Sequence, residues 1–217
     1  MKQIILLLIL TLSLLAFTTS AQDTDKKTAY FSANVSSYSS PQSYGPSRNE
    51  RQSRFGGGLG FGINLYHNVY FYGKATYIAR SDFTGIYDNN HYKTEFNISE
   101  NLSMVNASIA QLVVNGGIQY NIILSKELMI GVLGGITYSL VDQEARLFSG
   151  ELVQRIDYQS FYGYFGGVSA EKSFKDSDFS MFAEAIYNYI DDNSVYFRNV
   201  FSGMNFTIGG RYYFVGH

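Results

Sequence analysis

Histidine and carboxylate side chains are the groups of this sequence that could carry acid–base chemistry, and their spacing gives them little support. The 217 residues include three histidines. His67 falls in an expected tight turn and His217 ends the sequence, which leaves His91 with Asp191 and Asp192 as conceivable partners. A hydrolytic site needs its base held in a fixed array with a nucleophile or a second acid. A solvated loop histidine explains His91 better, so the sequence predicts no catalytic residue and no enzyme.

Metal and phosphate chemistry find no better support in the sequence. Residues 191–193, Asp-Asp-Asn, offer the oxygen ligands that hard cations prefer, but without spaced ligands or a glycine they fit a solvated loop tip. Cysteine is absent, which removes thiolate metal sites and disulfides. None of the glycine clusters opens an expected helix, as a phosphate-binding loop requires. We therefore expect neither a metal nor another cofactor.

The first 21 residues have the composition of a secretory signal peptide. Lys2 is followed by an apolar run over residues 4–17 and by the small residues Thr19, Ser20 and Ala21. Cleavage there predicts a single mature domain, residues 22–217. Loss of Lys2 changes the net charge only from −2 to −3, so no nucleic-acid partner is expected.

The composition of the remaining chain favours strands. Aromatic residues make up 17% of the sequence, with 21 Gly and 2 Pro. After the signal peptide no apolar run approaches the 18 or so residues of a membrane-spanning helix. Side chains alternate in character with the period of a strand in eight segments. These are residues 30–38, 55–66, 69–81, 109–122, 128–141, 158–172, 179–189 and 204–214.

The connections between these segments alternate in length. They are short at residues 67–68, 125–127 and 175–178, and long over residues 39–54, 82–107, 142–157 and 190–200. An even number of strands with short turns at one end and long loops at the other is typical of an outer-membrane barrel. The sequence therefore predicts an all-β fold: an eight-stranded, antiparallel, up-and-down transmembrane β-barrel with short periplasmic turns and long extracellular loops.

The apolar face of each segment is expected to point outward. An eight-stranded barrel has an interior that its own side chains just fill, and the polar, glycine-rich faces suit that space better than the aromatic ones. Lipid-facing tyrosines near both ends of the strands are then expected to form two girdles. Five charged residues would lie inside and pair with one another, with Arg211 next to Glu184 on the adjacent strand. The predicted interior charges are Lys74, Arg80, Glu171, Glu184 and Arg211.

The last segment also carries a recognisable pattern. In the string TIGGRYYF, Thr207 is followed by Gly209, Tyr212 and Phe214. This spacing resembles the C-terminal signal that the barrel-assembly machinery of the outer membrane reads. With the signal peptide and the eight segments, residues 28–217 resemble the small outer-membrane barrel families of the OmpA and OmpX type. The resemblance implies a location in the outer membrane and the assembly machinery as a partner.

The predicted function is that of a non-enzymatic outer-membrane scaffold whose four extracellular loops bind a partner or serve adhesion. The expected partners are outer-membrane lipid, lipopolysaccharide and an extracellular ligand of unknown identity. Arg48, Arg51 and Arg54 would either meet lipopolysaccharide phosphates or be ordinary loop residues. The alternatives are a soluble lipocalin-like binder of hydrophobic ligands, a secretion-accessory barrel and a small pore. A lipid A-modifying enzyme is disfavoured by the positions of the histidines.

Overall fold

The structure is a computed structural model that describes residues 27–39, 53–88, 102–125, 127–147, 149–175, 177–191 and 201–215. The predicted signal peptide, Arg48, Arg51, His91, Asp192, Asn193 and His217 lie outside these ranges. Among the described residues, no helix is long and apolar enough to cross a membrane.

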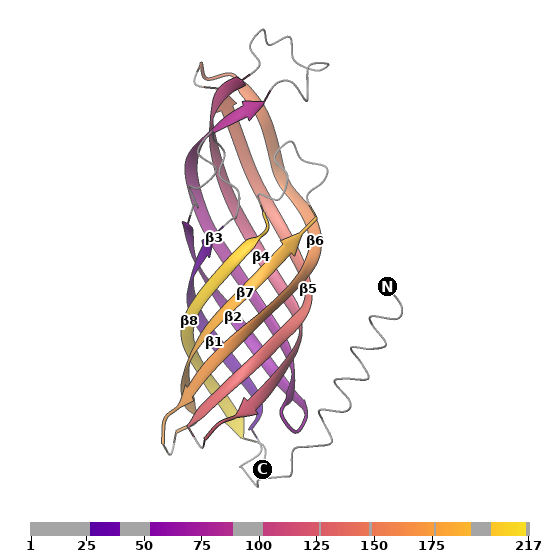
Figure 1. Ribbon diagram of the computed structural model, residues 1–217, viewed down its shortest axis with the longest axis vertical. Coiled ribbons are helices and arrows are strands. Elements are labelled where there is room, and N and C mark those ends of the chain that lie inside the picture. Colours follow the sequence, from indigo (N-terminus) through magenta and orange to yellow (C-terminus); the bar gives the residue numbers. More distant parts are fainter. Residues whose placement is uncertain are drawn as a thin grey trace, which may run out of the picture.

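Eight strands form one closed antiparallel barrel in which each strand pairs with its neighbours in the sequence (Figure 1). The strands are β1 (Lys27–Ser39), β2 (Ser53–Tyr66), β3 (Val69–Asp88), β4 (Leu102–Ile123), β5 (Leu128–Leu147), β6 (Leu152–Ser173), β7 (Phe179–Ile190) and β8 (Gly203–Val215). β1 and β8 close the barrel over a register that runs from Lys27 opposite Val215 to Ser39 opposite Met204. The predicted fold class is confirmed.

Four strands are longer than their alternation predicted. β3 to β6 have 20 to 22 residues each, whereas the other four have 12 to 14. Their added length lies at the end opposite the short turns, where they rise above the rest of the barrel in Figure 1. Much of the sequence predicted as the second and third long loops is therefore paired strand.

Outward and inward side chains alternate as expected. Along β7 exposed and buried residues take turns from Phe179 to Ile190. On β8 the side chains of Phe206, Ile208 and Phe214 are 51–61% exposed on the outside. Outward apolar side chains with an inward polar row are the reverse of a soluble domain and match a barrel surrounded by lipid.

The interior contains more aromatic rings than the sequence pattern predicted. Tyr72, Leu133, Phe165 and Ile186 form one buried cluster inside the barrel. Inward glycines make room for such rings: a Cβ atom at Gly62 would lie 2.2 Å from the ring of Tyr30. The glycine rows therefore hold bulky side chains of neighbouring strands, so that the barrel is filled.

Candidate functional site

A network of four charges fills the interior toward the short-turn end. The guanidinium of Arg211 on β8 contacts two carboxylates, with Nη1 2.5 Å from Glu171 Oε2 and Nη2 2.6 Å from Glu184 Oε1. Lys74 Nζ on β3 lies 2.9 Å from the second oxygen of Glu184. Each of these side chains is at most 2% exposed. Two cations and two anions balance each other, as buried charges must.

Hydroxyl groups and rings complete this network. Tyr213 and Ser180 donate hydrogen bonds of 2.6 and 2.7 Å to Glu171, and Lys74 donates one of 2.7 Å to Thr207. The guanidinium of Arg211 also lies over the ring of Tyr30, 4.6 Å from its centroid. Side chains from β1, β3, β6, β7 and β8 thus meet at one level and fill the lumen. These contacts connect five strands across the lumen, and the side chains occupy the path that a pore would need.

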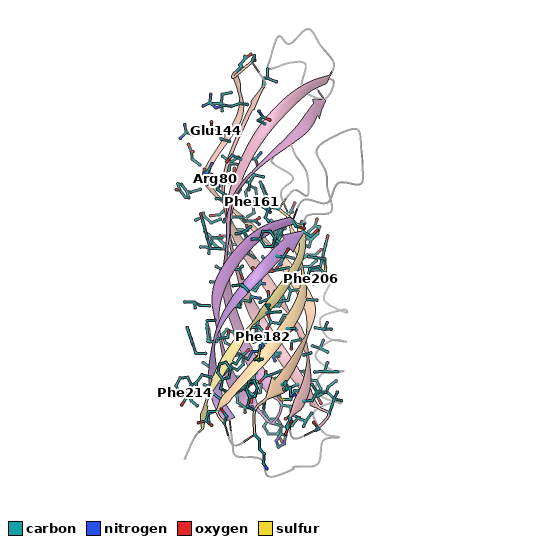
Figure 2. All side chains as sticks on the ribbon, turned by 90° about the vertical axis from the view of Figure 1, so that its left-hand side faces the viewer. Arg80, Glu144, Phe161, Phe182, Phe206 and Phe214 are labelled. Carbon is teal, nitrogen blue, oxygen red and sulfur yellow. The ribbon has the colours of Figure 1, made fainter. Side chains whose placement is uncertain are left out.

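Arg80 does not join the other four predicted interior charges, and this corrects the assignment made from alternation. Its side chain is 46% exposed and pairs with Asp142 on β5 and with Ser108. The pairing of β3 with β4 shifts register between Ile78 and Ser81, which breaks the alternation that had placed Arg80 inward. Figure 2 shows Arg80 near the point where the longer strands leave the barrel.

A second polar layer closes the interior at its opposite end. Phe201, just before β8, is fully buried, and its ring lies 5.1 Å from that of Phe161. The backbone carbonyl of Phe201 accepts hydrogen bonds from the hydroxyl of Tyr38 and from Gln111 Nε2. Arg54 donates to Gln111 Oε1 at 2.8 Å and is 4% exposed. The option of Arg54 as a surface contact for lipopolysaccharide is therefore wrong, because its side chain belongs to this layer.

The outer surface of the barrel carries a continuous apolar band. On β5 the outward row runs from Leu128 to Leu140, and the next outward residue is Asp142. A strand that rises ~3.4 Å per residue and tilts by ~45° advances roughly 29 Å over this row, close to the thickness of a hydrocarbon core. The band thus has the height that a membrane requires.

Aromatic side chains border this band at both ends. Outward rings at the short-turn end include Tyr66, Phe179, Tyr212 and Phe214, and those at the other end include Tyr77, Tyr158, Tyr162, Tyr164 and Tyr187. Tyr70 differs from its neighbours at the short-turn end because its side chain points inward and packs with Tyr30 and Tyr213. Two tyrosine-rich belts are the pattern expected at the two membrane interfaces.

The residues of the C-terminal pattern lie on both faces of β8. Thr207 is buried inside the barrel, whereas Tyr212 and Phe214 are about half exposed on the outside. The two rings contact each other edge to face with their centroids 5.4 Å apart. Thr207 also accepts the hydrogen bond from Lys74, so one of these residues has a structural role in the interior network.

Beyond the apolar band, β3 to β6 continue as a four-stranded sheet, which we call the extension. Its described residues are 79–88 on β3, 102–110 on β4, 142–147 on β5 and 152–160 on β6. β2 pairs with β3 only as far as Ile78, and the register of β7 with β6 ends at Gly163. Within the described residues, the extension therefore has two edges without a strand partner, as Figure 1 illustrates.

The tip and base of the extension are well defined. Leu147 and Glu151 are joined by a backbone hydrogen bond of 2.8 Å, and Gly150 turns the chain with a φ of 90°. At the base, β6 gains an extra residue opposite Asp142, where Tyr158 adopts a φ of 48°. Residues 142–157 had been predicted as a loop because they are polar, but strands in water need no apolar outer face.

One face of the extension is charged and solvent-exposed. Its ion pairs are Arg80 with Asp142, Arg146 with Glu144, and Arg155 with Asp157. The hydrogen bond from Arg146 lowers the pKa of the Glu144 carboxyl, and the hydrogen bond to Asp157 raises the pKa of Arg155. The opposite face places Ile109, Gln143 and Ile156 in buried positions. The sequence did not reveal this sheet because its polar outer face conceals the alternation.

Comparisons with known proteins identify the fold. No protein-family model and no curated protein sequence matches the chain. The crystal structure of Ail, the attachment invasion locus protein of Yersinia pestis, superposes with a TM-score of 0.54 at 12% identity over 86% of this chain and 97% of Ail. The chain has the fold of the small eight-stranded outer-membrane barrels. With the apolar band, this fold places the protein in the outer membrane.

Two further structures are similar. Ail in complex with the heparin analogue sucrose octasulfate gives a TM-score of 0.52 at 11% identity, with 86% of this chain and 97% of Ail covered. Neisserial surface protein A is 16% identical, with a TM-score of 0.48 over 86% of this chain and 97% of its own. The similarity to Ail establishes the fold, and sucrose octasulfate is a ligand of Ail.

Proposed function

We propose that the protein is a non-enzymatic scaffold that presents the extension and its loops outside the cell for binding or adhesion. The observation that carries this proposal is the four-stranded sheet that rises beyond the apolar band and whose two edges have no strand partner among the described residues. An exposed sheet edge binds an extended segment of a partner by main-chain hydrogen bonds. The filled and charge-plugged lumen disfavours a pore, and the outward apolar faces disfavour a soluble lipocalin-like binder.

The partner is expected at the edges of the extension and not at its charged face. Each arginine of that face is already paired with a carboxylate of the same face. A sulfated polysaccharide would need free cations, which the described part of the extension does not offer. An extended polypeptide segment instead suits the edges of β3 and β6, which pair with no other described strand in the extension. Lipopolysaccharide and the barrel-assembly machinery remain the proposed partners at the membrane.

Orientation is tested first, by labelling intact cells. The sequence has no native cysteine, so single cysteines replace Ser149 at the tip of the extension and Ser177 in a short turn. Both serines are exposed. A maleimide that cannot cross the membrane should label the Ser149→Cys variant in intact cells and the Ser177→Cys variant only after lysis. The reverse pattern would overturn the proposal.

Binding is tested with a variant that keeps the barrel and lacks the extension. Residues 82–108 and 143–157 are each replaced by a short glycine-containing turn, so that β1 to β8 still close. Cells with either protein are compared for capture of a panel of extracellular-matrix proteins and of heparin. We expect the wild type to capture a protein and the variant to lose that capture. Equal capture by both, or capture of heparin alone, would contradict the proposed role of the edges.

A further inference from the structure

The lipid-facing surface of β1 to β4 contains a groove of about 420 Å³. It lies along a row of directly paired residues, with Phe31 opposite Phe61, Phe61 opposite Gly73, and Gly73 opposite Gly116. The two glycines face outward in the sequence of alternating residues, so two neighbouring strands lack side chains at the same level. The ring of Phe61 covers Gly73, so the groove is the hollow that remains over Gly116 in the apolar band.

The two ends of the groove differ. Toward the short turns, the rings of Phe61 and Phe71 lie 6.0 Å apart and form an aromatic wall. A Cβ atom at Gly73 would lie 2.4 Å from the Phe61 ring, so this ring covers Gly73. Toward the extension, the groove is lined by the aliphatic side chains of Leu59, Ala75 and Val114, with the small Ala75 in the middle. The aromatic wall therefore stands on the periplasmic side of the hollow, and aliphatic side chains border its outer side.

The floor of the groove is open at Gly116. A Cβ atom there would meet no other atom within 4 Å. Gly116 lies near the middle of the outward row of β4, which runs from Leu112 to Ile122, and so lies near the midplane of the apolar band. An apolar hollow offers water few hydrogen-bond partners, so hydrocarbon occupies it more favourably than water does. Packing contacts are lost wherever such a hollow stays empty.

We propose that the groove binds one acyl chain of an outer-leaflet lipid, a lipopolysaccharide. The groove is continuous with the surface that already faces hydrocarbon, so an acyl chain is the group at hand. A chain that descends from the outer leaflet passes Val114 and Ala75, reaches the open floor at Gly116 and stops against Phe61 and Phe71. This inference goes beyond the proposed binding role of the extension and depends only on the orientation of the barrel, which the cysteine labelling tests separately.

Two matched variants test this assignment. Gly116→Phe places a ring in the groove, and the Cβ atom of the new side chain meets no other atom within 4 Å. Gly166→Phe is the control: Gly166 is also outward and exposed, its nearest neighbour would be 4.0 Å from a Cβ atom, and it lies on β6 away from the groove. Heat-dependent migration on gels and circular dichroism establish that both variants fold as barrels.

The readout is lipid retention in native mass spectrometry after exchange from bilayers into mild detergent. The probes are vesicles of phospholipid alone and vesicles that also contain lipopolysaccharide. We expect one lipopolysaccharide to remain on the wild type and on Gly166→Phe, and a roughly tenfold loss of retention on Gly116→Phe as the packed contacts disappear. Equal retention by all three proteins would overturn the proposal. So would preferential retention of phospholipid, or a wild-type dimer that Gly116→Phe dissociates.

Discussion

The interior of the barrel and the extension contain the same kinds of charged residue, but these residues have different roles in the two regions. Inside, Arg211 and Lys74 contact Glu171 and Glu184 with side chains at most 2% exposed. On the extension, the side chains of the paired arginines are 46–59% exposed. An exposed pair contributes little to stability because water screens it, whereas breaking a buried pair leaves a charge without compensation.

This difference in burial indicates that the interior and the extension have separate roles. The interior network and the layer around Phe201 hold the eight strands in one closed shape, and their chemistry is directed inward. The described residues of the extension form exposed ion pairs and no buried charge network. These exposed charges keep the sheet soluble outside the membrane. Substitutions should therefore affect stability in the first region and recognition in the second.

The largest expected effect comes from Arg211→Leu. Glu171 would lose its cationic partner at a buried position, so we expect a destabilisation of about 3–5 kcal/mol. Urea unfolding of the refolded barrel, followed by circular dichroism because the sequence has no tryptophan, measures it. Adding Glu171→Gln should recover part of the loss, since the stranded carboxylate is then neutral.

Arg146→Leu on the extension is the matched control for Arg211→Leu. It removes the same kind of group from an ion pair whose arginine is half exposed. The unfolding midpoint should not move measurably. A shift as large as that of Arg211→Leu would show that burial is not what separates the two regions.

Phe201→Ala should have the next largest effect. The ring is fully buried against Phe161, so its loss leaves a hollow, and we expect a cost of about 3 kcal/mol in the unfolding free energy. Phe206→Ala, whose ring is 52% exposed to lipid, should cost clearly less. Planar bilayers with Phe201→Ala should still show no large conductance, because the charged network remains. A large conductance would mean that Phe201 alone closes the lumen.

Phe214→Ala should lower assembly in cells without a comparable loss of stability. The exposed ring of Phe214 belongs to the proposed assembly signal, whereas Phe179, also exposed at the short-turn end, does not. We expect less folded Phe214→Ala protein in the outer membrane but normal refolding in detergent. Phe179→Ala should be normal in both assays. If both variants assemble equally, the resemblance of residues 207–214 to an assembly signal has no functional meaning.

Alternation predicted the eight strands, because lipid on one side and a narrow lumen on the other impose a two-residue period. The lengths of the connections predicted the order of the strands, and the narrow interior predicted that the apolar faces point outward. The same reasoning failed where lipid no longer constrains the outside. Residues 142–157 are polar on the outer face and were predicted as a loop, although they form paired strand. Arg80 was predicted to point inward because the alternation of its strand was assumed to continue. The register shift of β3 against β4 between Ile78 and Ser81 has no signal in the sequence.

The interior was harder to predict than the surface. Arg54 is the second residue of β2 and was considered a loop cation, since nothing in the sequence shows that its side chain contacts Gln111 and Tyr38. Phe165 interrupts the pattern of its strand because its ring fills the lumen with Tyr72. Such contacts join strands that are distant in the sequence, so only the closed barrel reveals them.

The smallest expected effect concerns the titration of Glu144. Its pKa is lowered by the hydrogen bond from Arg146, so the ionised form is favoured in the folded extension. The contribution of this pair is therefore complete above the ordinary pKa of a glutamate and disappears as the pH falls through the lowered value. Carboxyl NMR of the protein in nanodiscs should show a lower titration midpoint for Glu144 in the wild type than in Arg146→Gln. Because the pair is exposed, the extension should stay folded at low pH. Loss of its strands on acidification would contradict this expectation. It would show that the ion pairs of the charged face stabilise the sheet more than screened, exposed pairs should.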